Sequence, residues 1–340
     1  MSAEVKKYKL VEQWCHKKVS DGADFLFDPV LFHHSLYTAS KEFHFPFEAL
    51  QSFIRNITTI HVKRTSHIVR ANVGRIAQDY VKGTSILSLA RKSNYPPYLF
   101  CRILVEAITD MNGGKRALID AMRDPMAVLG DAKVILPKYI DSETIKRSEG
   151  FPRIDPQSSK PTTRLAQEVM EAIESDPMHG PRQDRQRHAI GIEYEAMLEK
   201  CLNELDVPFE SEQALRERGT SRTPDVLLSC PMGVRVTKKD ADDDGWRVIC
   251  WIDSKALFGD VNTHQTSVVP QAESYVHRFG PGLILYWFGC APVEMLDDAH
   301  GDIVISSWKL PEPLLFPTGE FTELQRRKKA GSEPKNEAMS

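Results

Sequence analysis

The spacing of apolar residues changes along this chain of 340 residues, and that change constrains the fold more than any other feature. Over residues 1–140, apolar side chains recur every three or four positions, which is the period of amphipathic helices. After about residue 205 the apolar runs become short or alternating and lie between Pro, Gly and Asp, which is typical of strands. The sequence therefore predicts an all-α region followed by an α/β region.

The breaks between these apolar runs predict the order of the secondary-structure elements and domains. We expect helices at 163–173, 184–205 and 271–278, and strands at 226–228, 247–255 and 283–288. Residues 141–161 are rich in Ser, Pro, Lys, Asp and Glu, as linkers are. The predicted organisation is a helical domain at 1–140, a linker at 141–161, an α/β domain at 162–318 and a disordered basic tail at 319–340. Four basic residues at 326–329 fit either a nuclear import signal or a solubilising tail.

Composition narrows the class of protein. With 41% hydrophobic and 27% charged residues, the chain has the balance of a soluble globular protein. No apolar run approaches the roughly 20 residues of a membrane span, so we expect no membrane interaction. The six cysteines form no CxxC pair, which argues against both a disulfide framework and a zinc ribbon.

Positive charge is concentrated in the helical region. Residues 41–125 carry 13 Lys or Arg against 7 Asp or Glu, whereas the whole chain has a formal net charge of -3. DNA, if the protein binds it, should therefore meet residues 41–125. A solvated basic helical surface explains the same excess.

A helical hairpin lies inside this basic window. A short helix is expected at 85–92, followed by a three-residue turn and a second helix that begins at 96–97 and continues through Ile108. This spacing suits a helix-turn-helix motif, in which Arg102 would enter a DNA groove and Arg91 and Lys92 would lie near the phosphate backbone. Ordinary structural packing of a helical hairpin produces the same pattern, and this alternative stays open.

The residues that indicate chemistry lie on two expected strands. Asp225 opens one strand, and Asp253 and Lys255 lie near the end of another. Because side chains alternate along a strand, Asp253 and Lys255 should share one face of the sheet. Paired carboxylates favour a divalent cation such as Mg²⁺ or Mn²⁺, and the lysine could position a water or offset charge on a phosphate. A surface salt bridge is the simpler interpretation of Asp253 and Lys255.

Together these residues resemble the PD-(D/E)xK nuclease superfamily, which implies a restriction-endonuclease-like fold. The helical acidic ligand of that superfamily matches Glu195, and Glu193 is the alternative. Residues two apart on a helix lie on different faces, so only one of the two glutamates can point into the site. Gln271 and Tyr275 resemble the QxxxY helix of that superfamily, in which these side chains contact DNA or brace the site. The resemblance thus implies metal ligation by Asp225, Asp253 and Glu195, and support of Lys255 by Gln271.

A closer resemblance rests on five segments. They are similar to the codanin-interacting nuclease family: His188-Ala189-Ile190-Gly191, Glu193-Tyr194-Glu195, Thr223-Pro224-Asp225, Trp251-Ile252-Asp253-Ser254-Lys255 and the run from Arg278 to Trp287. The nuclease resemblance covers about residues 185 to 290, and the helical half resembles the family's tandem helix-turn-helix region. It implies a metal-dependent nuclease of nucleus and cytoplasm that binds codanin. Position 253 is aspartate where glutamate is commoner in the family, which shortens the ligand arm by one methylene.

Two classes of function are consistent with these residues. The first is a DNA nuclease, and the second is a nuclease-fold adaptor with negligible turnover that docks onto codanin. The sequence leaves open RNA as a substrate and formation of a homodimer like that of the archaeal Holliday-junction resolvases, a branch of the PD-(D/E)xK superfamily that this chain resembles. No histidine is assigned a role, and His264, in the loop after the strand at 247–255, is expected to face solvent.

Overall fold

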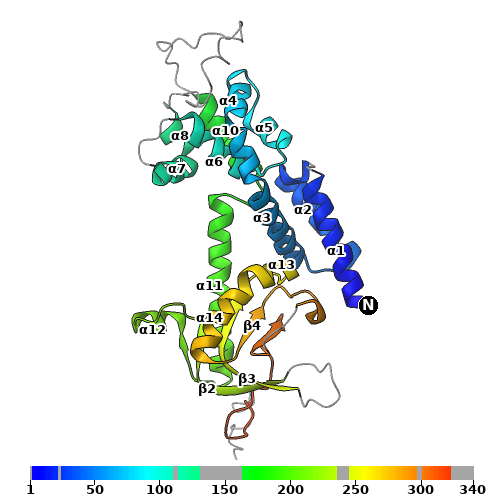
Figure 1. Cartoon of the computed structure of the whole chain (residues 1–340), viewed down its shortest axis with the longest axis vertical. Helices are drawn as coiled ribbons and strands as arrows, with labels where there is room; N and C mark the ends of the chain where they lie inside the picture. Colours follow the sequence, from blue (N-terminus) through cyan, green and yellow to red (C-terminus); the bar gives the residue numbers. More distant parts are fainter. Residues whose placement is uncertain are drawn as a thin grey trace, which may run out of the picture. The chain divides into compact units, whose positions relative to one another are not determined.

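The computed structural model describes residues 2–21, 24–109, 114–130, 163–235, 245–296 and 301–322. These residues form two compact units, one helical and one built on a β-sheet (Figure 1). The helical unit takes its described residues from 10–47 and 54–187, and the sheet unit takes its described residues from 1–9, 48–53 and 188–340. The expected linker at 141–161 and all but the first four residues of the expected tail lie outside the described residues.

The helical periodicity of the first region is confirmed. Its helices are α1 (Ala3–Ser20), α2 (Pro29–Phe43), α3 (Phe47–Ala71), α4 (Val73–Val81), α5 (Ile86–Lys92), α6 (Pro97–Ile108), α7 (Gly114–Arg123) and α8 (Pro125–Leu129), with a short 3-10 turn at Asp24–Leu26. Within α2, for example, the buried side chains Phe32, Leu36 and Ala39 follow the helical period. None of the described helices combines the length and apolar character needed to cross a bilayer.

The hairpin expected inside the basic window is present as α5 and α6. Ser85 caps α5 by accepting a hydrogen bond from the N–H of Ser88 at 3.3 Å, and Pro97 lies in the first turn of α6. The apolar face of α6, including Phe100 and Leu104, is buried within the helical unit. The two helices therefore pack as expected, and DNA contact by them stays a prediction.

The helix α10 (Thr163–Ser175) packs against α5, α6 and α8. The sequence predicts this helix correctly but assigns residues 162 onward to the α/β domain. Its apolar face, with Leu165, Val169 and Ala172 fully buried, completes the helical unit. The helix α11 (Pro181–Glu204) follows, and its residues from His188 onward belong to the sheet unit. Whether 1–140 and 162–318 fold independently stays a prediction.

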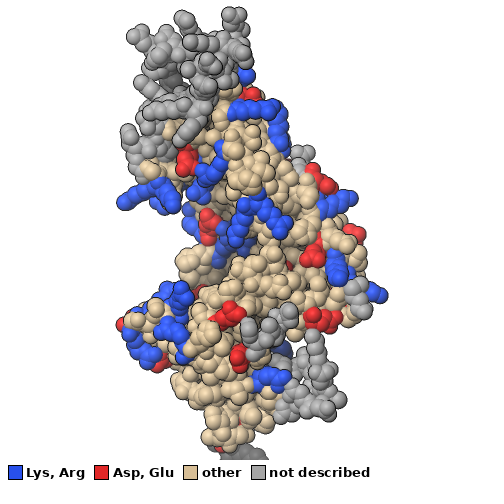
Figure 2. All heavy atoms as spheres, viewed as in Figure 1, with Lys and Arg blue, Asp and Glu red and all other residues tan. Residues whose placement is uncertain are grey.

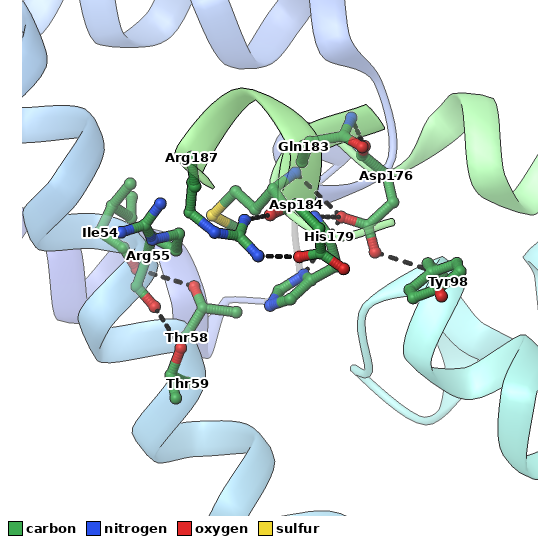
Figure 3. Close-up of polar contacts among 11 residues, drawn as sticks. Ile54, Arg55, Thr58, Thr59, Tyr98, Asp176, His179, Gln183, Asp184 and Arg187 are labelled. Carbon is green, nitrogen blue, oxygen red and sulfur yellow. Dashed lines mark hydrogen bonds and ion pairs between the residues drawn. The ribbon is translucent and has the colours of Figure 1, made fainter. Parts of the chain in front are cut away.

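The segment between α10 and α11 is fixed by one buried carboxylate. Asp176 is fully buried and accepts hydrogen bonds from the N–H groups of Tyr98 at 3.1 Å, Met178 at 3.0 Å and His179 at 2.8 Å (Figure 3). Gln183 donates to the carbonyl of Asp176 at 2.9 Å. Asp176 thereby joins the start of α6 to the start of α11.

The sheet has five strands in the order β1-β2-β3-β4-β5. These are β1 (Phe209–Ser211), β2 (Val226–Arg235), β3 (Trp246–Lys255), β4 (Gly282–Tyr286) and β5 (Ile303–Ser307). The first two pairings are antiparallel, and β3, β4 and β5 run parallel. The strands expected at 226–228, 247–255 and 283–288 are confirmed, although β2 runs further because a register shift between Leu227 and Met232 carries it past Pro231.

Helices cover both faces of this sheet. Leu198 and Leu202 of α11 pack on one face with Ile252 and Leu283. On the other face, Ala272 and Tyr275 of α14 (Val269–Phe279) pack with Trp251. The remaining short helices are α12 (Glu212–Glu217), α13 (Val261–Thr263), a π-helical turn (His264–Val268) and a 3-10 turn (Val293–Met295). The structure is thus mixed α/β, with an N-terminal helical region, and is compatible with a nuclease-like fold.

Candidate active site

Two strands bring the predicted carboxylates to one end of the sheet. Val226 of β2 pairs with Ile252 of β3, so Asp225 lies beside the end of β3. A carboxylate oxygen of Asp225, Oδ2, accepts a hydrogen bond from the N–H of Ser254 at 2.6 Å. Ile252 is buried on the face covered by α11, and strand alternation puts Asp253 and Lys255 on the face covered by α14.

Asp253 and Lys255 form a buried ion pair. The Nζ of Lys255 lies 2.5 Å from Oδ2 of Asp253, and the side chains are 16% and 2% exposed. Burial raises the pKa of Asp253, and the charge of Lys255 opposes that rise. Burial alone would lower the pKa of Lys255, but Asp253, Asp225 and Glu195 together outweigh it, so the pKa lies above its ordinary value. The simpler interpretation, a surface salt bridge, does not fit a carboxylate buried this deeply.

Helix α14 extends this ion pair into a chain of hydrogen bonds. Nζ of Lys255 donates to Oε1 of Gln271 at 3.0 Å, and Nε2 of Gln271 donates to the hydroxyl of Tyr275 at 2.7 Å. The ring of Tyr275 packs edge-on against Trp251, with 5.3 Å between ring centroids, and the residue is 3% exposed. Gln271 therefore fixes the ammonium of Lys255 from a rigid helix. Contact of Tyr275 with DNA stays a prediction.

Asp225 and Asp253 disfavour each other's ionisation. The pKa of Asp225 is raised by burial and then by the charge of Asp253, while Lys255 and the N–H of Ser254 lower it. Two adjacent carboxylates, one buried and one half-buried, with one lysine are a donor set that a hard divalent cation would neutralise. Asp225 and Asp253 thus offer oxygen ligands of the kind that Mg²⁺ or Mn²⁺ prefers, and binding of either cation stays a prediction.

Of the two candidate helical ligands, Glu195 and not Glu193 shares a cavity with Asp225. Glu195 and Asp225 both line a cavity of about 640 Å³, and Glu193 is not among the residues that line it. The pKa of Glu195 is raised by partial burial, then by Glu212 and Asp253. Within the described residues, no three His, Cys, Asp or Glu side chains are gathered tightly enough to form a metal site. Metal ligation by Asp225, Asp253 and Glu195 together therefore stays a prediction.

The other predicted nucleic-acid contacts belong to the helical unit. Arg91 is exposed and lies over the ring of Phe27 at 5.4 Å, Lys92 is exposed, and Arg102 lies over the ring of Tyr98 at 5.8 Å. The carboxylates, Lys255 and Gln271 belong to the sheet unit. The prediction that Arg91, Lys92 and Arg102 bind DNA thus concerns a different unit from the candidate active site.

Sequence reasoning missed Glu212. Its N–H donates to the carbonyl of Asp225 at 2.9 Å, and its carboxylate accepts from the hydroxyl of Thr223 at 3.3 Å. Glu212 also raises the pKa of Glu195, so its charge acts on the site. Ser211, which accepts from the N–H of Ala214 at 3.4 Å, was the available signal, because serine followed by glutamate is typical of a helix start.

Comparison with known proteins adds three findings. Residues 161–308 match the family model TPD, described as a protein of unknown function with a TPD sequence motif, and this chain has Thr223-Pro224-Asp225 in that range. A Xenopus laevis protein is 31% identical over 274 residues, which cover 78% of this chain and 76% of the relative. A Bos taurus protein is 30% identical (67% and 71% covered), and a Danio rerio protein is 40% identical (60% and 55% covered). All three are named CDAN1-interacting nuclease 1. No solved structure matches the chain.

Proposed function

The chain belongs to the CDAN1-interacting nuclease 1 family, and from that premise we propose that it is a divalent-metal-dependent DNA nuclease that acts with codanin (CDAN1). The observation that carries the proposal is the pair of adjacent carboxylates, half-buried Asp225 and buried Asp253, held beside Lys255. Burying this set without a function would cost stability, because desolvated carboxylates repel each other.

In the proposed reaction, Asp225, Asp253 and Glu195 would hold Mg²⁺ or Mn²⁺. Bound there, the cation would supply charge neutralisation at the phosphate and a more acidic water. Lys255 has a raised pKa and so carries a proton at neutral pH. Its ammonium would orient the attacking water and offset the charge that develops on the phosphate oxygens. Gln271 would fix the direction of that ammonium through its 3.0 Å hydrogen bond.

The finer assignments belong to the same proposal. The sheet and its helices would form a restriction-endonuclease-like, PD-(D/E)xK domain, and the basic helices of residues 41–125 would hold DNA through Arg91, Lys92 and Arg102. Phosphate contacts of this kind would give an affinity that falls with salt. The protein would act in nucleus and cytoplasm.

Cleavage of a labelled DNA panel tests this proposal. Single-stranded, duplex, flap and four-way-junction DNA would be incubated with Mg²⁺, Mn²⁺ or EDTA and either the wild-type protein, Asp253→Ala or Lys255→Ala. We expect metal-dependent cutting that each substitution reduces by about 100-fold or more. The matched controls Asp302→Ala and Lys309→Ala change exposed residues of the same unit and should retain cutting. Cutting that survives both active-site substitutions would come from a contaminant and would refute the assignment.

One observation favours the adaptor as a second candidate. Oδ2 of Asp253 is already engaged by Lys255 at 2.5 Å, which leaves it less available to a cation. In that case the protein would bind codanin without turnover. Pull-down by codanin and rescue of depleted cells by Asp253→Ala would support the adaptor, whereas binding without rescue would support catalysis.

A further inference from the structure

Two cavities meet at helix α12 in the sheet unit. The first, of about 640 Å³, is the acidic cavity: it is lined by Asp225 and by Glu195, Glu199, Glu212 and Glu217. The second, of about 610 Å³, is the hydroxyl cavity: it is lined by Ser221, Thr223 and Ser274, with Gln271, Tyr275 and two arginines. Glu212 and Arg216 line both cavities, so α12 forms the wall between them.

The hydroxyl cavity has the donors that an anion requires. Its two arginines are Arg216, on α12, and Arg222, in the loop that leads into β2. Figure 2 shows Lys and Arg side chains gathered over the position of α12. Gln271, which also lines this cavity, is hydrogen-bonded to Lys255, so the cavity borders the candidate active site. Guanidinium and hydroxyl groups together are typical ligands of phosphate.

The structure holds Arg222 in a costly conformation. Its φ is 52°, a left-handed value that a non-glycine residue rarely adopts, and it lies three residues before Asp225. The loop is pinned by Arg278, which donates to the carbonyl of Ser221, and by the 3.3 Å hydrogen bond from Thr223 to Glu212. Arg222 is exposed, and among the described residues the ion pairs near this cavity are formed by Arg216 and Arg218 rather than by Arg222. The loop therefore presents the positive charge of Arg222 to the hydroxyl cavity, which Glu212 also lines.

Three arginines near α12 differ in a way that allows a controlled test. Arg216 pairs with Glu212 at 2.6 Å, and Arg218 pairs with Glu210 at 2.8 Å. Their side chains are similarly exposed, at 67% and 58%. Arg218 lines neither cavity, so it is a matched control for Arg216.

We propose that Arg216 and Arg222 form a phosphate-binding subsite for the DNA strand, next to the phosphate that is cleaved at Asp225 and Asp253. The proposal rests on the proposed nuclease function. It assigns the hydroxyl cavity to binding of the DNA backbone and the acidic cavity to binding of the metal ion. Because these contacts are to phosphates, they add affinity without sequence preference.

Fluorescence anisotropy of a labelled single-stranded DNA in EDTA tests the subsite apart from cleavage. We expect Arg216→Gln and Arg222→Gln each to weaken binding by about tenfold, as loss of a charge-assisted hydrogen bond does. Each should also reduce the slope of log K against log salt by about 0.7. Arg218→Gln should stay within about twofold of wild type with an unchanged slope. Arg222→Lys, which keeps the charge, should recover part of the lost affinity, and thermal melting of each variant checks its folding.

The outcomes separate the two proposals. If wild-type protein binds and cleaves DNA while the three glutamine variants bind equally well, the subsite is refuted and the nuclease stands. Equal losses in Arg216→Gln and Arg218→Gln would also refute it, since they would reflect general surface charge. If wild-type protein neither binds nor cleaves DNA, both the subsite and the proposed function fail.

Discussion

At the scale of single residues, the position of one ammonium decides the chemistry of the site. Lys255 is held by Asp253 at 2.5 Å and by Gln271 at 3.0 Å, and Gln271 is held in turn by Tyr275. A lysine has four flexible side-chain torsions, so restraint from two directions removes much of the entropy that catalysis would otherwise cost. Gln271 is thus a positioning residue that acts through Lys255.

Removing Gln271 should slow the reaction without weakening substrate binding. We expect Gln271→Ala to lower kcat by about tenfold, with KM nearly unchanged, because the ammonium loses its orientation. Tyr275→Phe keeps the ring against Trp251 and should lower kcat by only about threefold. Steady-state kinetics on the preferred DNA substrate check both values. An unchanged kcat in Gln271→Ala would show that Asp253 alone positions Lys255.

The histidine after β3 is a correction to the sequence analysis. His264 was expected to face solvent, yet it is fully buried, and its Nδ1 lies 2.8 Å from the hydroxyl of Tyr286. The π-helical turn His264–Val268 directs it inward. Burial lowers the pKa of His264 below its ordinary value of 6.5, and Asp260 opposes that shift. The imidazole is therefore neutral in the folded protein at neutral pH.

Stability should fall in acid because of this histidine. The folded-state pKa of His264 lies below the unfolded-state value of about 6.5, so the unfolded chain takes up a proton first as the pH falls. The stability that is present above pH 6.5 is therefore lost below it, by up to about 1.4 kcal/mol per pH unit. We expect His264→Asn to be less stable at pH 7.5 but to lose less stability between pH 7.5 and 5.5. Urea unfolding at both pH values measures this difference. Exposed His34 is the control, and a slope changed equally by His34→Asn would contradict the assignment.

At the scale of elements, buried polar groups fix how helices are joined. Asp176 lies between α10 and α11 and accepts hydrogen bonds from three N–H groups, one of them at the start of α6 (Figure 3). Close to it, Asp184 forms an exposed ion pair with Arg187 (Figure 3). The two aspartates lie eight residues apart and differ mainly in burial, which is 0% exposed for Asp176 and 58% for Asp184.

This difference in burial predicts that substitution by alanine destabilises the protein more at Asp176 than at Asp184. Asp176→Ala leaves buried N–H groups without acceptors and should lower the free energy of unfolding by about 2–4 kcal/mol. Asp184→Ala should cost less than about 1 kcal/mol, because exposed ion pairs contribute little. Chemical denaturation of both variants measures the values. Similar small losses in both would mean that water replaces the carboxylate of Asp176.

At the scale of the whole molecule, the sheet unit is not one continuous segment. It includes described residues from 1–9 and 48–53 together with those from 188 onward. The ring of Phe258 packs at a tilt against Phe53 at 5.1 Å and stacks on Tyr8 at 6.4 Å, and the N–H of Phe258 donates to the hydroxyl of Ser52 at 2.8 Å. Residues from the first part of the chain thus pack against the segment that follows β3 and complete the core there.

A fragment cut at the expected domain boundary should therefore be unstable. Residues 162–322 lack Tyr8, Ser52 and Phe53, and we expect a loss of about 3–5 kcal/mol relative to residues 1–322. Thermal unfolding followed by circular dichroism compares the two. If the fragment melts at the same temperature as residues 1–322, these aromatic contacts are dispensable and the boundary at 162 defines an independent domain.

The sequence alone was sufficient for features that depend on local geometry. Helical and strand periods identified α5, α6, α10, α11, α14 and three of the five strands, and alternation along β3 put Asp253 and Lys255 on one face. The one-turn spacing of Gln271 and Tyr275 also follows from helix geometry. These inferences hold because the backbone's repeat is set within a few residues.

Only the tertiary structure decided which elements pack together. The strands β1 and β5 are short, at three and five residues, and sheet pairing rather than local pattern stabilises them. Likewise, α10 packs in the helical unit, His264 is buried, and Glu212 lies beside Asp225. Each of these depends on contacts between residues far apart in sequence, where burial of apolar surface outweighs local preference.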